Sequence, residues 1–304
     1  MVEGKSRTPN LAAELALLAV LATLWGASYT FIKISVETIP PLTLIAARTV
    51  IAQTLLLCII GARRLSMPRD AVMWRRFLFQ ACLNSVVPFT LIAWAERTVD
   101  AGLATILNST SPIFVFLLTL FMVRHEPITA RKMFGVAAGM IGICLIVGVE
   151  ALGGLGRELV AQLAIVAATI CYAGAAIFGR NFKGLDPMIP AAGSLLCGSV
   201  VLIPASLVVD RPWQLTPSLD SVLALIALSV FSTALAHTIY FRLVHTLGSV
   251  GATAQSYLRV PVGVAIGVVF LGEHLTSTIW IGLACVVAGV AAMTIPARKS
   301  ALQT

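Results

Sequence analysis

The chain has 304 residues, of which 59% are hydrophobic and only 11% are charged, and its formal net charge at pH 7 is +8. Soluble domains carry about 25% charged residues, so this composition excludes an ordinary soluble enzyme, and it is far too apolar for a disordered chain. Because about 20 apolar residues cross a bilayer, the length accommodates about ten spans with short loops.

Predicted membrane helices account for nearly the whole chain. Windows of about 19 residues place them, in chain order, at 11–33, 40–60, 77–95, 101–123, 134–149, 158–178, 188–209, 221–243, 250–271 and 276–295. Helices satisfy their own backbone hydrogen bonds within lipid. We therefore predict an all-α membrane protein with ten transmembrane helices and no folded domain outside the bilayer.

The distribution of basic residues predicts the orientation. Lys and Arg concentrate in the tails and loops on the side of the N-terminus, as at Arg63, Arg64, Arg131 and Lys132, and are few on the other side. By the positive-inside rule, both termini are expected in the cytoplasm. Such loops and anionic headgroups account for the positive net charge, so membrane lipid is an expected partner and nucleic acid is not.

The two halves of the chain, 1–150 and 151–304, are similar in sequence. At shifts of 147 to 149 positions, the coinciding pairs include Phe31 and Phe178, Glu126 and Glu273, Gly135 and Gly282, and Pro112 and Pro261. Each half holds an odd number of predicted spans, so the second half enters the membrane from the opposite side. We expect two inverted five-helix repeats in one membrane unit, which favours alternating-access transport. Gene duplication without transport is the alternative.

Several features resemble a known family. The ten-span layout, the mid-helix prolines Pro112 and Pro261, and the helix ends at Glu126 and Glu273 are similar to the drug/metabolite transporter superfamily, EamA type. The resemblance implies a secondary transporter of the bacterial cytoplasmic (inner) membrane, most like exporters of aromatic and other neutral amino acids. It also implies a central cavity between the first four helices of each half. A multidrug exporter of lipophilic cations such as methyl viologen is the alternative.

Two arginines lie deep within predicted spans, where charge is costly and usually faces a cavity or a partner. Arg259 follows Gln255 by four residues and shares its helix face. Its guanidinium is suited to a substrate carboxylate, or alternatively to backbone carbonyls exposed at the Pro261 kink. Arg48 either faces the same cavity or has a structural role, clamping helices or reaching toward a membrane rim.

Other polar side chains mark candidate cavity walls. The eighth span carries His237 and Tyr240 on one polar stripe, and the third and fourth spans carry Asn84 and Asn108. We expect these groups to line the cavity. A proton relay is a further role for His237, and bridging between helices is the alternative for the two amides.

Aromatic residues and prolines complete the predicted site. The aromatic set Trp25, Tyr29, Tyr172 and Tyr257 forms either a platform for a substrate side chain or ordinary packing. The prolines Pro88, Pro112 and Pro261 are predicted helix kinks with a role in gating.

The remaining sequence features narrow the chemistry. Glu14, about one turn from the end of the first span, reads as a solvated or capping carboxylate. No Walker A motif, metal-ligand cluster or catalytic constellation occurs in the sequence, so we expect neither a cofactor nor an enzyme. Gly135 and Gly139 lie four apart and permit close helix contact, either inside one subunit or at a dimer face. We expect a monomer or a weak homodimer.

Overall fold

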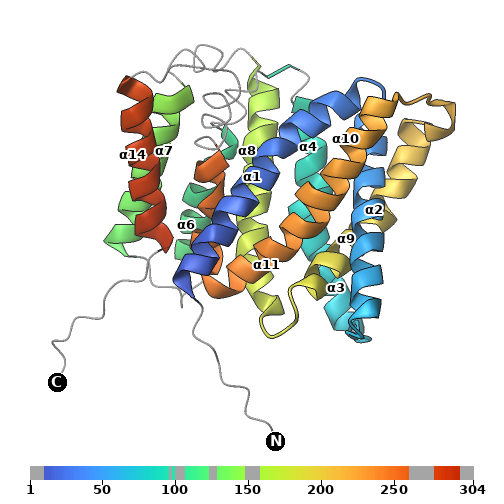
Figure 1. Ribbon diagram of the computed structural model, residues 1–304, viewed down its shortest axis with the longest axis horizontal. Coiled ribbons are helices and arrows are strands. Elements are labelled where there is room, and N and C mark those ends of the chain that lie inside the picture. Colours follow the sequence, from blue (N-terminus) through green and yellow to red (C-terminus); the bar gives the residue numbers. More distant parts are fainter. Residues whose placement is uncertain are drawn as a thin grey trace, which may run out of the picture.

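The computed structural model describes residues 10–95, 98–99, 107–122, 129–147, 158–259 and 277–294. Within these ranges every regular element is a helix, and the long helices stand side by side in one bundle (Figure 1). The α-helices are α1 (Leu11–Val36), α2 (Pro41–Ala62), α3 (Ala71–Ala81), α4 (Val87–Ala95), α6 (Ser111–Met122), α7 (Ala130–Val147), α8 (Leu159–Phe178), α9 (Met188–Val209), α10 (Leu219–Ser229), α11 (Ala236–Thr246), α12 (Gly248–Thr253) and α14 (Ser277–Thr294). Two short 3₁₀ helices are η3 (Gly179–Phe182) and η4 (Pro212–Gln214).

Two further segments are π-helical turns inside longer helices. The turn η1 (Cys82–Val86) joins α3 to α4, and η5 (Val230–Leu235) joins α10 to α11. A π turn adds one residue to the helical repeat and is frequent at functional sites. The helices that carry these two turns are therefore candidates for part of a functional site.

The apolar spans predicted from sequence are mostly helical where the structure describes them, with turns at 109–110 and at 254 inside two of them. Five helical segments are long and apolar enough to cross a membrane, at Leu11–Ser28, Pro41–Ala62, Leu159–Phe182, Met188–Val209 and Leu219–Thr246, and Trp280–Met293 is a shorter apolar helix. Parts of the predicted spans 101–123 and 250–271 lie outside the described residues. The all-helical class is confirmed, and the count of ten spans stays a prediction.

Polar residues at the predicted span ends fix where helices begin. The side chain of Asn10 accepts from the backbone N–H of Ala12 at 3.1 Å and caps α1. Ser218 caps α10 in the same way, accepting from the N–H of Ser221 at 3.2 Å. Such caps satisfy donors that have no partner within the helix.

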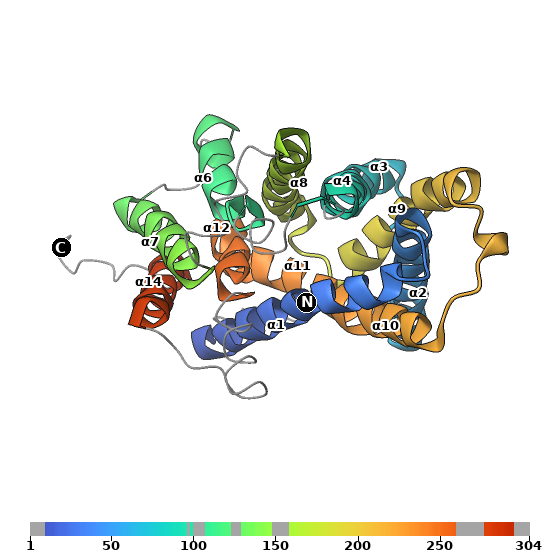
Figure 2. The same ribbon diagram turned by 90° about the horizontal axis from the view of Figure 1, so that it is seen from above.

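The helices pack in pairs that join the two halves of the chain. Helix α2 lies along α9, α7 along α14, α1 along α10 and α4 along α8, as the view from above shows (Figure 2). In the α7–α14 pair, a Cβ added to Gly135 would lie 2.7 Å from the backbone oxygen of Gly289, closer than side chains tolerate. Gly135 and Gly139 therefore serve close packing inside one subunit, which was the first of the two predicted alternatives.

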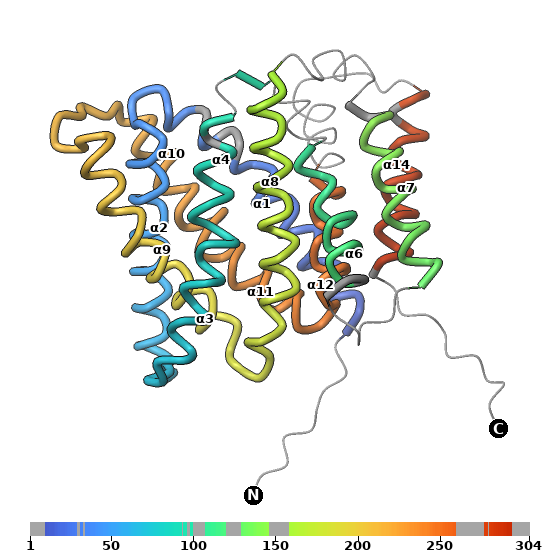
Figure 3. The backbone as a smooth tube through the Cα atoms, turned by 180° about the vertical axis from the view of Figure 1, so that it is seen from behind, coloured from blue at the N-terminus to red at the C-terminus, as the bar shows by residue number. Residues whose placement is uncertain are grey.

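Short contacts tie the loops at both ends of the bundle. At one end Arg63, after α2, lies 3.6 Å from Asp186, before α9. At the other end Asp210, after α9, accepts from the backbone N–H of Thr43 at 2.7 Å. Helix α1 begins and α14 ends at the same end of the bundle (Figures 1 and 3). The assignment of that end to the cytoplasm stays a prediction.

The bundle buries polar groups beside its apolar core and exposes many large apolar side chains on its surface. Val160, Val208 and Phe134 are well exposed, whereas Arg48, Gln80 and Asn84 are buried. Water would penalise such an outer surface, but lipid does not. The interior can therefore hold the polar cavity described next.

Candidate functional site

A cavity of ≈ 90 Å³ lies between the helices of the bundle, with room for several waters or a small organic molecule. Its wall includes most of the residues predicted from sequence: Trp25, Arg48, Asn84, Asn108, Tyr172, His237, Tyr240, Gln255 and Arg259. They come from α1, α2, η1, α8 and α11 and from the segments around 108 and 253–259. Residues far apart in sequence thus meet at one site.

One predicted aromatic residue, Tyr257, lies outside the cavity wall. Tyr257 is fully buried, donates from its hydroxyl to the carbonyl oxygen of Val136 at 3.1 Å and packs on Gly139. It is not among the lining residues, because it packs against α7. The side chain of Tyr29 and the whole of Pro261 lie outside the described residues.

Two of the three prolines predicted as gating kinks, Pro88 and Pro112, lie within the described residues, and neither is in the middle of a regular helix. Pro112 is the second residue of α6, where a missing N–H costs no helical hydrogen bond. The expectation of a mid-helix position is therefore wrong for Pro112. Pro88 directly follows η1 and Val87, so its missing donor adjoins a turn that is already irregular. Both side chains are buried.

Arg48 is held against the π turn η5. It is 4% exposed, its Nε donates to the hydroxyl of Thr233 at 2.6 Å, and its Nη2 donates to the carbonyl oxygen of Ser232 at 3.4 Å. The guanidinium also lies over the ring of Phe89, with Cζ 4.3 Å from the ring centre, a favourable cation–π arrangement. Arg48 thus clamps helices together and adds a positive charge to the cavity wall.

Arg259 lies on the face of Trp25. Its Cζ is 5.2 Å from the centre of the indole, and its Nε donates to the side-chain oxygen of Gln255 at 2.9 Å. The indole is itself fixed, because its Nε1 donates to the carbonyl oxygen of Ser232 at 3.1 Å. The side chain of Arg259 is only partly buried, so a ligand in the cavity can reach its guanidinium.

The Trp25 ring also contacts the polar stripe predicted on the eighth span. The ring of His237 meets the indole edge to face, with centres 6.1 Å apart, and the ring of Tyr240 lies 5.5 Å away. Among the described residues, neither Nε2 of His237 nor the hydroxyl of Tyr240 has a hydrogen-bond partner. Buried polar groups are normally paired, so this wall has hydrogen-bonding capacity left for a ligand.

Sequence reasoning missed several parts of this wall. Phe89, which covers Arg48, is one apolar residue among many in its span, and hydropathy gives no signal for it. Ser28 and Thr253 also line the cavity, but hydroxyl residues are common in membrane helices. The two π turns η1 and η5 were also missed, although they coincide at a shift of 148, within the range at which the halves align.

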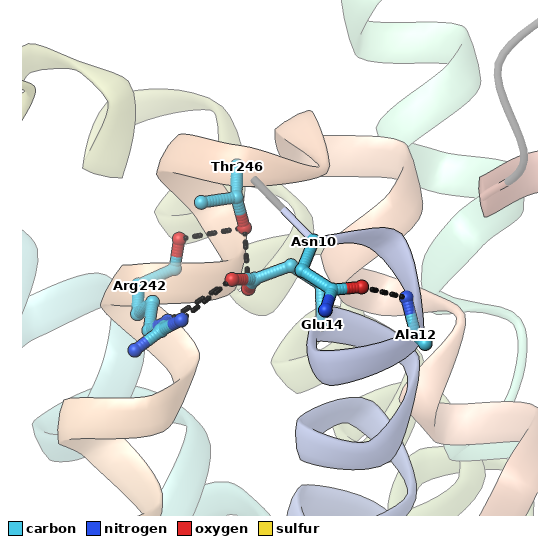
Figure 4. A network of polar contacts seen from close by, with 5 residues as sticks. All are labelled: Asn10, Ala12, Glu14, Arg242 and Thr246. Atoms are coloured by element: carbon cyan, nitrogen blue, oxygen red, sulfur yellow. Dashed lines mark hydrogen bonds and ion pairs between the residues drawn. The ribbon is translucent and has the colours of Figure 1, made fainter. Parts of the chain in front are cut away.

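A second polar cluster lies at the end of the bundle where α1 begins (Figure 4). Glu14 is 2% exposed, accepts from Nη2 and Nε of Arg242 at 2.7 and 3.2 Å, and accepts from the hydroxyl of Thr246 at 2.9 Å. The expectation of a solvated or capping carboxylate is therefore wrong. Because α1 and α11 cross here, Glu14 meets a partner distant in sequence, and we call this cluster the Glu14 latch.

Apolar helices long enough to cross a membrane surround a cavity lined by two arginines, the arrangement expected of a helical membrane protein. The chain belongs to the EamA-like transporter family, whose model matches residues 13–148 and again 159–295. The resemblance to this family in the sequence is thereby confirmed.

Several relatives are transporters by name. One is the uncharacterized inner membrane transporter YedA of Escherichia coli K12, which is 28% identical over 91% of this chain and 89% of its own length. Another is the uncharacterized transporter YoaV of Bacillus subtilis 168, which is 23% identical over 88% of this chain and 91% of its own. A solved crystal structure has the same fold, with a TM-score of 0.78 and 17% identity over 94% of this chain and 99% of that one.

Proposed function

We propose that the protein exports amino acids and related small metabolites across the bacterial cytoplasmic membrane by alternating access, with both termini in the cytoplasm. The observation that carries the substrate class is the position of Arg259, which reaches the cavity while its guanidinium rests on Trp25. A guanidinium can bind a carboxylate through two parallel hydrogen bonds. The aromatic walls at Trp25, Phe89 and Tyr172 offer apolar surface to a bulky side chain.

The charge of the cavity favours a carboxylate over a lipophilic cation. Arg48 and Arg259 both line it, and no Asp or Glu is among the described lining residues. A lipophilic cation would meet two guanidinium groups and no opposite charge among the described lining residues, whereas the ammonium group of an amino acid comes with a carboxylate that offsets this repulsion. We therefore expect that methyl viologen is not transported, and its transport would count against a carboxylate site.

Alternating access requires two related halves that move against each other, and we assign these halves to 1–150 and 151–304. The family model matches once in each half. The pairs α2–α9 and α7–α14 each join helices that coincide under the repeat, as expected around a two-fold axis. The π turns η1 and η5 also coincide and occupy places where each half can bend.

We further propose that the Glu14 latch closes the bundle at the end where α1 begins. Glu14 precedes Trp25 by eleven residues in α1, which is about 16 Å along the helix. The lining continues the other way, to Ile32 and to Pro41 at the start of α2. The latch holds α1 to α11 at the predicted cytoplasmic end, so it must separate when the cavity opens there.

Uptake into liposomes containing the purified protein tests this function. Labelled phenylalanine, threonine and methyl viologen are supplied separately, and we expect uptake of the amino acids and not of methyl viologen. Arg259→Ala should abolish amino acid uptake, and Arg259→Lys should restore it only in part because the planar fork is lost. Arg75→Ala, which changes an exposed arginine of α3, is the matched control. Uptake of methyl viologen alone, insensitive to Arg259, would refute the proposal.

A further inference from the structure

The wall formed by α1 and α11 contains an acceptor without a partner. His237 is 1% exposed and lines the cavity, and its Nδ1 lies 2.9 Å from the carbonyl oxygen of Thr233. A carbonyl oxygen only accepts hydrogen bonds, so Nδ1 carries the proton. In the neutral ring Nε2 is then an acceptor, and none of the described residues lies within hydrogen-bond distance of it.

The surrounding charges favour that neutral form. Thr233 links His237 to Arg48, because its carbonyl oxygen accepts from the imidazole while its hydroxyl accepts from Nε of Arg48 at 2.6 Å. Arg259 lines the same cavity. A second proton on the ring would therefore add a positive charge near the guanidinium of Arg48, in a cavity that Arg259 also lines.

The acceptor and the proposed carboxylate site flank the same indole. The guanidinium of Arg259 lies over the face of Trp25, and the ring of His237 meets Trp25 at 82°. The indole is held in place by its bond to the carbonyl oxygen of Ser232. A ligand lying against Trp25 can thus present one end to Arg259 and the other to His237.

We propose that Nε2 of His237 accepts a hydrogen bond from the 2-amino or 2-hydroxy group of the transported acid while Arg259 holds its carboxylate. This assignment rests on the proposed function and specifies how that site recognises its substrate. Nε2 is shielded in the present arrangement, so the bond forms as this wall adjusts around the ligand. An acid without a donor at C2 leaves the buried acceptor unpaired, and a site of this kind discriminates strongly against such analogues.

Three acids with the same benzyl group test the assignment in liposomes. Phenylalanine carries a 2-amino group, 3-phenyllactate a 2-hydroxy group, and 3-phenylpropionate no donor at C2. In the wild type we expect kcat/KM for the first two to exceed that for the third by about tenfold or more. His237→Phe keeps an aromatic ring but removes the acceptor, so the ratio should fall to roughly one while uptake of 3-phenylpropionate persists. Thr238→Val, at the next position and outside the lining residues, is the control.

The outcomes separate this inference from the function on which it rests. Equal kcat/KM for all three acids in the wild type, or an unchanged preference in His237→Phe, would overturn the role of His237 and leave carboxylate transport standing. Uptake of none of the three acids would instead overturn the proposed function.

The ¹⁵N spectrum of histidine-labelled wild type gives an independent readout. We expect a ring protonated at Nδ1 and an Nε2 resonance that shifts with phenylalanine and not with 3-phenylpropionate. A ring protonated at Nε2 would contradict the assignment even if His237→Phe did not fold.

Discussion

Glu14→Gln is predicted to loosen the end of the bundle where α1 meets α11. The wild-type carboxylate accepts from Arg242 at 2.7 and 3.2 Å and from Thr246 at 2.9 Å. The variant keeps the size of the side chain and one acceptor oxygen, but it loses the negative charge and one acceptor. Its effect is therefore on the latch rather than on the volume of the buried position.

The expected magnitude follows from these contacts. Hydrogen bonds to charged groups contribute about 1.5–3 kcal/mol, but the side chain of Arg242 is 50% exposed, and solvent screens the pair. We expect a net loss of about 1–2 kcal/mol in the arrangement closed at this end, which shifts the conformational equilibrium roughly 5- to 30-fold. Arg242→Ala should have a larger effect, because it leaves the buried carboxylate without its charged partner.

Labelling of a single cysteine measures this shift. Leu21 is fully buried in α1 between Glu14 and Trp25, so Leu21→Cys, in a chain with its six native cysteines replaced, should react slowly with a membrane-impermeant maleimide added from the latch side. Glu14→Gln should raise the labelling rate by the same 5- to 30-fold. Glu37→Gln, an exposed change just after the same helix, should not. Equal rates in all three backgrounds would refute the latch.

Three further substitutions test the packing and the site. Gly139→Ala places a methyl group against the ring of Tyr257 and should destabilise the fold by about 1–3 kcal/mol. The loss is measured as a lower midpoint of thermal unfolding. The control is Gly61→Ala, whose methyl group meets nothing within 4 Å and should leave the midpoint nearly unchanged. Arg48→Ala removes the hydrogen bond to the hydroxyl of Thr233 and should lower the stability by about 1.5–3 kcal/mol. It should also abolish amino acid uptake. Full uptake would restrict Arg48 to a structural role. Asn10→Ala removes the cap of α1 and should cost about 1 kcal/mol in the same unfolding assay without changing uptake at saturating substrate.

Hydropathy predicts the helices well because each span must be apolar over the thickness of a membrane. The expected span 188–209 is α9, Met188–Val209, and 40–60 is α2, Pro41–Ala62. The π turns were not predicted, since one extra residue in a helical turn leaves the hydropathy unchanged. The position of Pro112 at a helix start depends on an interruption before α6 that hydropathy also does not detect.

The site was predicted where charge or polarity conflicts with an apolar span. Arg48 and Arg259 stand out for this reason, and both line the cavity. Aromatic residues give no such contrast, so Trp25, in the cavity wall, and Tyr257, packed against α7, were indistinguishable from sequence. Glu14 was misread because its partner Arg242 is 228 positions away, and only the fold brings them together.

Equilibrium binding of labelled phenylalanine to the purified protein tests the central claim most directly, because it requires neither a gradient nor an assignment of transport direction. The cavity predicts saturable binding that competing carboxylates displace. Binding should weaken roughly 10- to 150-fold in Arg259→Ala, the loss of one charge-assisted contact of about 1.5–3 kcal/mol, and should be unchanged in Arg75→Ala. Equal affinity in the wild type and Arg259→Ala would contradict the account.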